Sequence, residues 1–172
     1  KAITVSTLDE KYQKIIDDRV NHPYQYEFEV PGDLEGFTPG FLTATVQNGV
    51  LKGSAIERVG QTPAYDPMFH LNDLSISAFE CNKIAVKLKH NLPNNNNSTI
   101  EIFFTTNSDK NLNQDKSARA AIPTKSSDEF VEYIVDFSEN EFWTGTITGI
   151  RLDIFHCAGD YEIDYVRFII DE

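Results

Sequence analysis

One carboxylate near the C-terminus stands within an apolar alternation. The stretch DYEIDYVRFII, residues 160–170, has the two-residue period of a β-strand, whose successive side chains point to opposite faces. Asp164 is then in line with Val166 and Phe168, on the face that we expect to point at the core. A buried charge without compensation costs on the order of several kcal/mol. Asp164 therefore needs a basic partner, a set of backbone donors or a metal ion, unless the register is shifted by one residue and it points outward.

The rest of the chain offers no recognisable catalytic motif. It contains no nucleophile elbow, no HExxH zinc motif, no glycine-rich dinucleotide loop and no P-loop. Its four histidines are scattered, and none stands at metal-ligand spacing from another. The 27 acidic residues leave room for a glycosidase-like carboxylate pair, but a solvated acidic surface is the commoner explanation at a net charge of −12. We therefore expect a protein that is not an enzyme.

Composition narrows the class of partner. The 172 residues are enough for one domain with a proper core, and the hydrophobic fraction of 40% argues against disorder. The net charge of −12 argues against nucleic acid and against an anionic membrane surface as partners. No apolar run approaches the roughly 20 residues of a membrane span. The chain begins at Lys1 without a leader, so we expect a mature or excised piece of a larger protein.

The periodicity divides the chain into a helical segment and a β domain. Apolar residues recur at helical spacing over residues 8–20, and the pattern stops at Pro23 because the residue before a proline avoids helical geometry. We therefore expect residues 1–22 to form a helix on the domain edge, or a linker. Residues 23–172 carry about ten strand-like stretches separated by turn residues, which predicts an all-β fold. The expected architecture is a two-sheet antiparallel β-sandwich, or jelly roll, with a short N-terminal helix. Cys81 and Cys157 are either unpaired or bridged.

Three groups of motifs, in order along the chain, resemble a known family. They are YEFEVPGDLEGF with VQNGVLKGSA and YDPMF, then STIEIFFTTNSD with KSARAAIP, and then EFVEYIVDFSENEFWTGTITGIRLDIF with GDYEIDYVRFI. Together they resemble the galactose-binding-like jelly-roll carbohydrate-binding modules, in the style of families four, sixteen and twenty-two. The resemblance covers residues 24–170. Phe37 stands where the family has Trp, and Ile154 where it has Pro, which suggests a divergent member.

The resemblance implies a function and a setting. Its members are non-catalytic modules that bind polysaccharide or oligosaccharide and are appended to secreted polysaccharide-degrading enzymes or cell-surface proteins. We therefore expect a secreted or cell-surface chain whose partners are a glycan and the other domains of a larger protein. By analogy the glycan is a plant cell-wall β-glucan, mannan or xylan. The competing expectation is a protein-interaction or adhesion domain on the same fold, and a third is a glycan-active enzyme.

The resemblance also implies a structural calcium ion. Family members hold one between the acid of the first strand and the Asp of the last, which match Glu29 and Asp164. Glu27 is a second candidate ligand, and the hairpin around Lys52 offers a backbone carbonyl. Calcium takes six to eight oxygen ligands, including carbonyls. The alternative is that Asp164 pairs with a basic residue.

A glycan site requires aromatic rings and planar polar groups on one surface. In TGIRLDIF the alternation predicts that Arg151, Asp153 and Phe155 lie opposite the core face. If this strand adjoins STIEIFFTT and KIAVKLKH in one sheet, Phe103 and Lys87 join the same surface. The alternative is that these charges form structural cross-strand ion pairs. The further candidates are Tyr65 and Asp66 in the YDPMF loop, and Trp143, for which packing and sugar stacking are equally expected.

Overall fold

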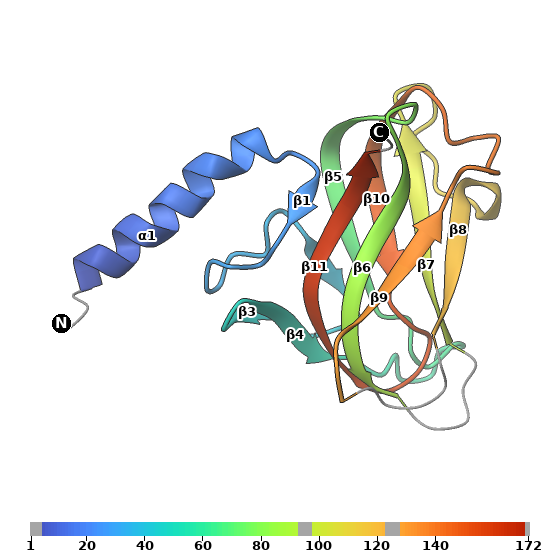
Figure 1. Ribbon diagram of the computed structural model, residues 1–172. Helices are drawn as coiled ribbons and strands as arrows, with labels where there is room; N and C mark the ends of the chain where they lie inside the picture. The colour runs from blue at the N-terminus through green and yellow to red at the C-terminus, as the bar shows by residue number, and fades with distance from the viewer. Residues whose placement is uncertain (1–4, 93–97, 123–127, 171–172) are drawn as a thin grey trace.

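Two antiparallel β-sheets lie face to face, and one helix extends away from them (Figure 1). The computed structural model describes residues 5–92, 98–122 and 128–170. This arrangement confirms the predicted all-β sandwich with a short N-terminal helix. Core side chains from the two sheets fill the space between them.

The six-stranded sheet has the order β3-β4-β11-β6-β9, and β1 also pairs with β11. Its strands are β1 (Gln25–Tyr26), β3 (Thr45–Gln47), β4 (Val50–Ser54), β6 (Cys81–Asn91), β9 (Val131–Asp136) and β11 (Asp160–Ile170). The five-stranded sheet has the order β2-β5-β10-β7-β8. Its strands are β2 (Thr38–Gly40), β5 (Met68–Ser77), β7 (Ser98–Thr106), β8 (Ser117–Ile122) and β10 (Thr146–Asp153).

The first strand is much shorter than the YQYEFEV alternation predicts. β1 stops at Tyr26, and Phe28 has a left-handed backbone with φ of 52°. The backbone N–H groups of Glu27 and Phe28 donate to the Glu35 carboxylate, at 3.1 and 2.8 Å, and not to a neighbouring strand. A side chain seven or eight residues along the chain has replaced the sheet ladder here, which periodicity does not reveal.

The last strand contains a register shift that overturns the expected position of Asp164. Tyr161 and Ile163 are buried, and so are Val166 and Phe168, although the two pairs differ in parity. The ladder between β11 and β6 shifts between Ile163 and Tyr165, as at a β-bulge, and Asp164 lies at the shift. Its side chain is 33% exposed and lies 2.8 Å from Lys87 Nζ. The prediction of an inward Asp164 is therefore wrong, and a lysine compensates its charge.

Trp143 belongs to the core. It is 6% exposed, stacks on Phe137 with a ring separation of 4.0 Å, and meets Phe104 edge-on. Its indole N–H donates to the carbonyl of Cys81 at 2.7 Å. Because its ring faces are taken by other side chains, Trp143 is a packing residue and not a sugar-stacking platform.

The N-terminal helix is held at its C-terminal end. α1 (Val5–Asp18) continues into a 3₁₀ turn, η1 (Arg19–Asn21), close to the helical range predicted from the sequence. Arg19 contacts Asp33 at 2.6 Å and Glu35 at 2.8 Å, whereas Val20 beside it is 79% exposed. No helix among the described residues has the length and apolar character of a membrane span.

The two cysteines are far apart and do not form a disulfide. Cys81 pairs with Ile170 at one end of β11, and Cys157 precedes Asp160 at the other end. Both are buried. Of the two alternatives that the sequence left open, the unbridged one holds.

A buried histidine predicts loss of stability in mild acid. His90 on β6 is 3% exposed, neither ring nitrogen has a hydrogen-bond partner among the residues that the structure describes, and burial lowers its pKa below 6.5. Below pH 6.5 the unfolded chain therefore binds a proton at His90 more readily than the folded chain does. The free energy of unfolding is unaffected by protonation of His90 above pH 6.5 and falls as the pH drops below it. We expect His90→Leu to reduce the fall in melting temperature between about pH 7 and about pH 5.

His22→Leu is the matched control, because the His22 side chain is 54% exposed. It should melt with the same pH dependence as the parent chain. Parallel loss of stability with pH in the parent and His90→Leu would contradict this role for His90.

Candidate functional site

The outer face of the five-stranded sheet gathers polar side chains around the middle of β10. Ile150 and Leu152 point into the core, so Arg151 and Asp153 point to the opposite side. In the sheet register Arg151 lies between His70 on β5 and Phe103 on β7. The structure thus places Phe103 beside Arg151, in the neighbouring strand that the sequence analysis considered.

Arg151 binds Asp153 and covers Phe103. Its Nε and Nη2 atoms donate to the two carboxylate oxygens of Asp153, at 2.8 and 2.7 Å. The same guanidinium lies 4.2 Å from the centre of the Phe103 ring. Burial raises the pKa of Asp153 above 3.8, and the arginine opposes this shift. The Arg151 guanidinium therefore lies over the Phe103 ring and is bonded to the Asp153 carboxylate, on the outer face of the sheet.

A second carboxylate, Glu101, is neutralised beside the first. It is the cross-strand partner of Asp153 and contacts Arg119 on β8 at 3.0 Å. Ser117 donates to it at 2.8 Å, as does Gln114, in η2 (Gln114–Lys116), at 2.6 Å. Burial opposes ionisation of Glu101, but these hydrogen bonds outweigh it and keep the pKa below 4.5. The segment before β8 thus folds over this end of the sheet face.

Each ion pair turns its cation to the solvent. The Asp153 and Glu101 side chains are 1% and 4% exposed, whereas those of Arg151 and Arg119 are 24% and 54% exposed. The pKa of His70 beside them is lowered below 6.5 by burial and then by the charge of Arg151. A ligand at these two pairs would therefore meet the guanidinium groups before the carboxylates of Asp153 and Glu101.

The rim loop reaches the same face. Asp66 contacts Arg58 at 3.0 Å, and its charge contributes to raising the pKa of Asp153. Tyr65 is half-buried beside it. Arg58 also lies 4.9 Å from the centre of the Phe41 ring. Asp66 is therefore close to the polar cluster, as predicted, with Tyr65 next to it along the chain.

Three predicted site residues lie elsewhere. Lys87 is on β6, in the six-stranded sheet, because β7 and not β6 adjoins β10. Phe155 is fully buried, because it lies beyond the end of β10, where the strand alternation no longer applies. Trp143 packs in the core as described above. None of these three can contact a ligand on this face.

Sequence reasoning missed three basic residues of the site: Arg58, His70 and Arg119. A partial signal was present for two of them. His70 alternates with the buried Phe69 and Leu71, and Arg119 alternates with Ala118 and Ala120, which pack against the core. Only the sheet order brings β5 and β8 to the two sides of β10 and β7, and Arg58 comes from a loop without periodicity.

The carboxylate pair on this face does not have the form of a glycosidase site. Asp153 and Glu101 are adjacent, and their pKa values shift in opposite directions. Each, however, is covered by an arginine and almost inaccessible. A catalytic acid or base has to come within hydrogen-bond reach of its substrate. In this arrangement the two carboxylates hold arginines in place.

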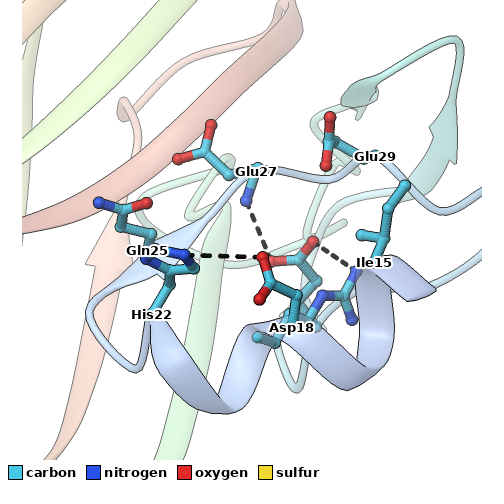
Figure 2. Close-up of a pocket in the computed structure, with 8 residues that line it drawn as sticks. Ile15, Asp18, His22, Gln25, Glu27 and Glu29 are labelled. Atoms are coloured by element: carbon cyan, nitrogen blue, oxygen red, sulfur yellow. Dashed lines mark hydrogen bonds and ion pairs between the residues drawn. The ribbon is translucent and has the colours of Figure 1, made fainter. Parts of the chain in front are cut away.

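The four residues predicted to hold calcium are not brought together. Glu27 and Glu29 line a pocket between α1 and the chain after β1, with Asp18 and His22 across it (Figure 2). Glu27 is bound by Arg167 through two hydrogen bonds, of 2.6 and 2.7 Å. Glu29 is exposed at the edge of the pocket.

The remaining two predicted ligands lie on other elements. Asp164 pairs with Lys87, and Lys52 lies on β4 opposite Glu162 of β11. Among the described residues, no group of three or more His, Cys, Asp or Glu side chains is placed to hold a metal ion. The donor set therefore does not fit calcium in this arrangement of side chains.

Comparison with known proteins identifies the fold. No protein-family model matches the chain, and no curated protein sequence matches it. The solved structure of BiXyn10A CBM1 in its apo form is 10% identical, with a TM-score of 0.53, and the match covers 87% of this chain and 98% of that one. A variant of the family 29 carbohydrate-binding module CBM29-2 complexed with cellulohexaose is 15% identical, with a TM-score of 0.51 and coverage of 83% and 89%.

A second CBM29-2 variant, complexed with mannohexaose, is 16% identical, with a TM-score of 0.50 and coverage of 81% and 85%. The chain thus shares the fold of carbohydrate-binding modules, as its motifs predict. The narrower resemblance to families four, sixteen and twenty-two stays a prediction.

Removing Arg151 should lower the free energy of unfolding more than removing Arg119 does. Arg151→Ala leaves the Asp153 carboxylate buried without its partner, and we expect it to lower the free energy of unfolding by about 3 kcal/mol at neutral pH. Protonation would relieve this burial, so the loss should shrink as the pH falls towards about 4. Denaturant titration at several pH values measures both effects.

Arg119→Ala is the control, because Glu101 keeps its bonds to Gln114 and Ser117. Since Arg119 is exposed, its loss should cost about 1 kcal/mol or less. If the two variants lost the same free energy of unfolding, an unpaired buried Asp153 would not be the cause of the loss in Arg151→Ala.

Proposed function

We propose that this chain is a non-catalytic module that binds polysaccharide through the outer face of its five-stranded sheet. The observation that carries the proposal is the cluster of Arg151, Asp153, Phe103, Glu101 and Arg119 on that face, with its side chains fixed by one another. Guanidinium groups held in fixed directions by buried carboxylates suit the recognition of hydroxyl-rich ligands. Modules of the same fold have been solved with cellulohexaose and with mannohexaose, which supports this class of ligand.

The site is built for binding and not for reaction. Its carboxylates are almost inaccessible and serve as hydrogen-bond acceptors for arginines. An appended binding module keeps an attached enzyme or cell surface near a polymer without acting on it. Because such polymers lie outside the cell, the proposal places the chain in a secreted or cell-surface protein that has further domains.

Affinity electrophoresis tests the proposal directly. We expect at least one polysaccharide from a panel of soluble β-glucan, glucomannan, xylan and polygalacturonate to retard the chain in a native gel. Arg119→Ala should weaken the retardation, whereas Arg167→Ala, on the six-stranded sheet, should not. If no polymer retards the chain, a protein-interaction domain becomes the better account. If soluble sugars are released on incubation, the chain is an enzyme.

Structural calcium is a separate prediction, made from the family resemblance and from the expected inward position of Asp164. An ion between Glu29 and Asp164 would stabilise the folded chain by about 2.7 kcal/mol at a free concentration a hundred times Kd, which corresponds to roughly 5–10 °C in melting temperature. The ion pairs of Asp164 with Lys87 and of Glu27 with Arg167 instead require no metal. A fall in melting temperature on chelation that calcium reverses, and that Asp164→Asn abolishes, would support calcium. An unchanged melting curve would leave the basic residues as the complete account.

A further inference from the structure

Aromatic rings on and beside the candidate face are covered by arginines. Phe103 is 8% exposed and has the Arg151 guanidinium 4.2 Å from its centre. Phe41 at the rim is more accessible, but the Arg58 guanidinium lies 4.9 Å from its centre. Neutral sugars stack their C–H faces on bare aromatic rings. On Phe103 and Phe41 an arginine guanidinium lies where a sugar would stack.

The arginine is the accessible member of both ion pairs, Arg151–Asp153 and Arg119–Glu101, although the chain as a whole is acidic. The net charge is −12, which repels an anionic polymer at most places on the surface. On this face the carboxylates of Asp153 and Glu101 lie beneath their arginines. Lys110, from the loop before β8, adds a cation by donating to Thr148 at 2.8 Å. The face is therefore a local site where an anion would meet donors first.

Both guanidinium groups keep donors beyond their ion pairs. Arg151 uses Nε and Nη2 for Asp153, and Arg119 uses Nη2 for Glu101. An arginine has five N–H donors in a planar fork that matches a carboxylate. The Nη1 group of each arginine thus lies outside the pairs described, and the buried carboxylates hold both forks in position.

We propose that the polysaccharide bound by this face carries carboxylate groups, as a polymer of uronic acids does, and that Arg119 and Arg151 bind them. This inference rests on the proposed function and narrows its ligand from polysaccharides in general to acidic ones. A planar carboxylate accepts two parallel N–H bonds from one guanidinium, which a single sugar hydroxyl cannot do. The acidic sugar therefore replaces aromatic stacking as the main source of affinity.

One polymer with and without its charge provides the test. The probes are polygalacturonate and the same polymer with its carboxylates methyl-esterified, each cast in native gels. We expect retardation by polygalacturonate, loss of retardation on esterification, and weakening as the salt concentration is raised, because added ions screen exposed charges. Poly-glutamate and a sulfated galactan are included as polyanions that lack the uronic acid.

Arg119→Gln is the main variant, because Glu101 keeps two other donors and the fold should survive. We expect it to weaken polygalacturonate binding by about tenfold, the effect of losing one charge-assisted hydrogen bond. The matched control is Arg167→Gln, which removes a 40% exposed arginine from the other sheet. It should leave binding unchanged.

The outcomes separate this inference from the proposed function. Equal retardation by charged and esterified polymer, or by neutral glucomannan alone, would overturn the acidic ligand and leave polysaccharide binding intact. Equal binding of poly-glutamate or of sulfated galactan would reduce the effect to general polyanion attraction and also overturn it. If Arg167→Gln abolished retardation and Arg119→Gln did not, the site would lie on the six-stranded sheet, and both the proposed face and the roles of Arg119 and Arg151 would be overturned. Absence of retardation by every polysaccharide would overturn both proposals.

Discussion

The burial of the Asp153 carboxylate determines how the outer face of the five-stranded sheet is built. A carboxylate that is 1% exposed must be paired, and Asp153 is bound by Arg151, two residues earlier on its own strand. That bond lays the guanidinium over Phe103 and so covers the ring. Glu101, on the neighbouring strand, repeats the arrangement with Arg119. The same burial that costs desolvation energy also fixes the direction of two arginines before any ligand arrives.

The two faces of the sandwich use the same residue types in different ways. On the six-stranded sheet, Arg167 and Lys87 lie beside the Tyr165 ring, much as Arg151 covers Phe103. Their acidic partners, however, remain accessible, with Glu27 at 32% and Asp164 at 33% exposure. Charges on that face are balanced at the surface, where each exposed pair contributes little. On the candidate face Asp153 and Glu101 are hidden beneath their arginines, so these pairs present mainly guanidinium groups to a ligand.

The N-terminal part of the sandwich depends on Glu35 in a comparable way. Its carboxylate accepts the N–H groups of Glu27 and Phe28, which turn away from the sheet after β1. It also receives Arg19, so that one side chain connects the helix end to the first strand. From this connection α1 extends away from the sheets (Figure 1).

Periodicity and the order of the motifs predicted the class of fold, the helical segment and the central residues of the candidate site. Periodicity was sufficient for these because Arg151 and Asp153 alternate with buried Ile150 and Leu152 within one regular strand. It failed at Asp164 and Phe155, where a bulge and a strand end break the alternation. Contacts between distant segments place Lys87 in the other sheet, bring Arg119 and Arg58 to the site, and bury Trp143 in the core. The physical reason is that strand order and local shifts in register depend on contacts between distant segments, whereas alternation records only which side of a strand is buried.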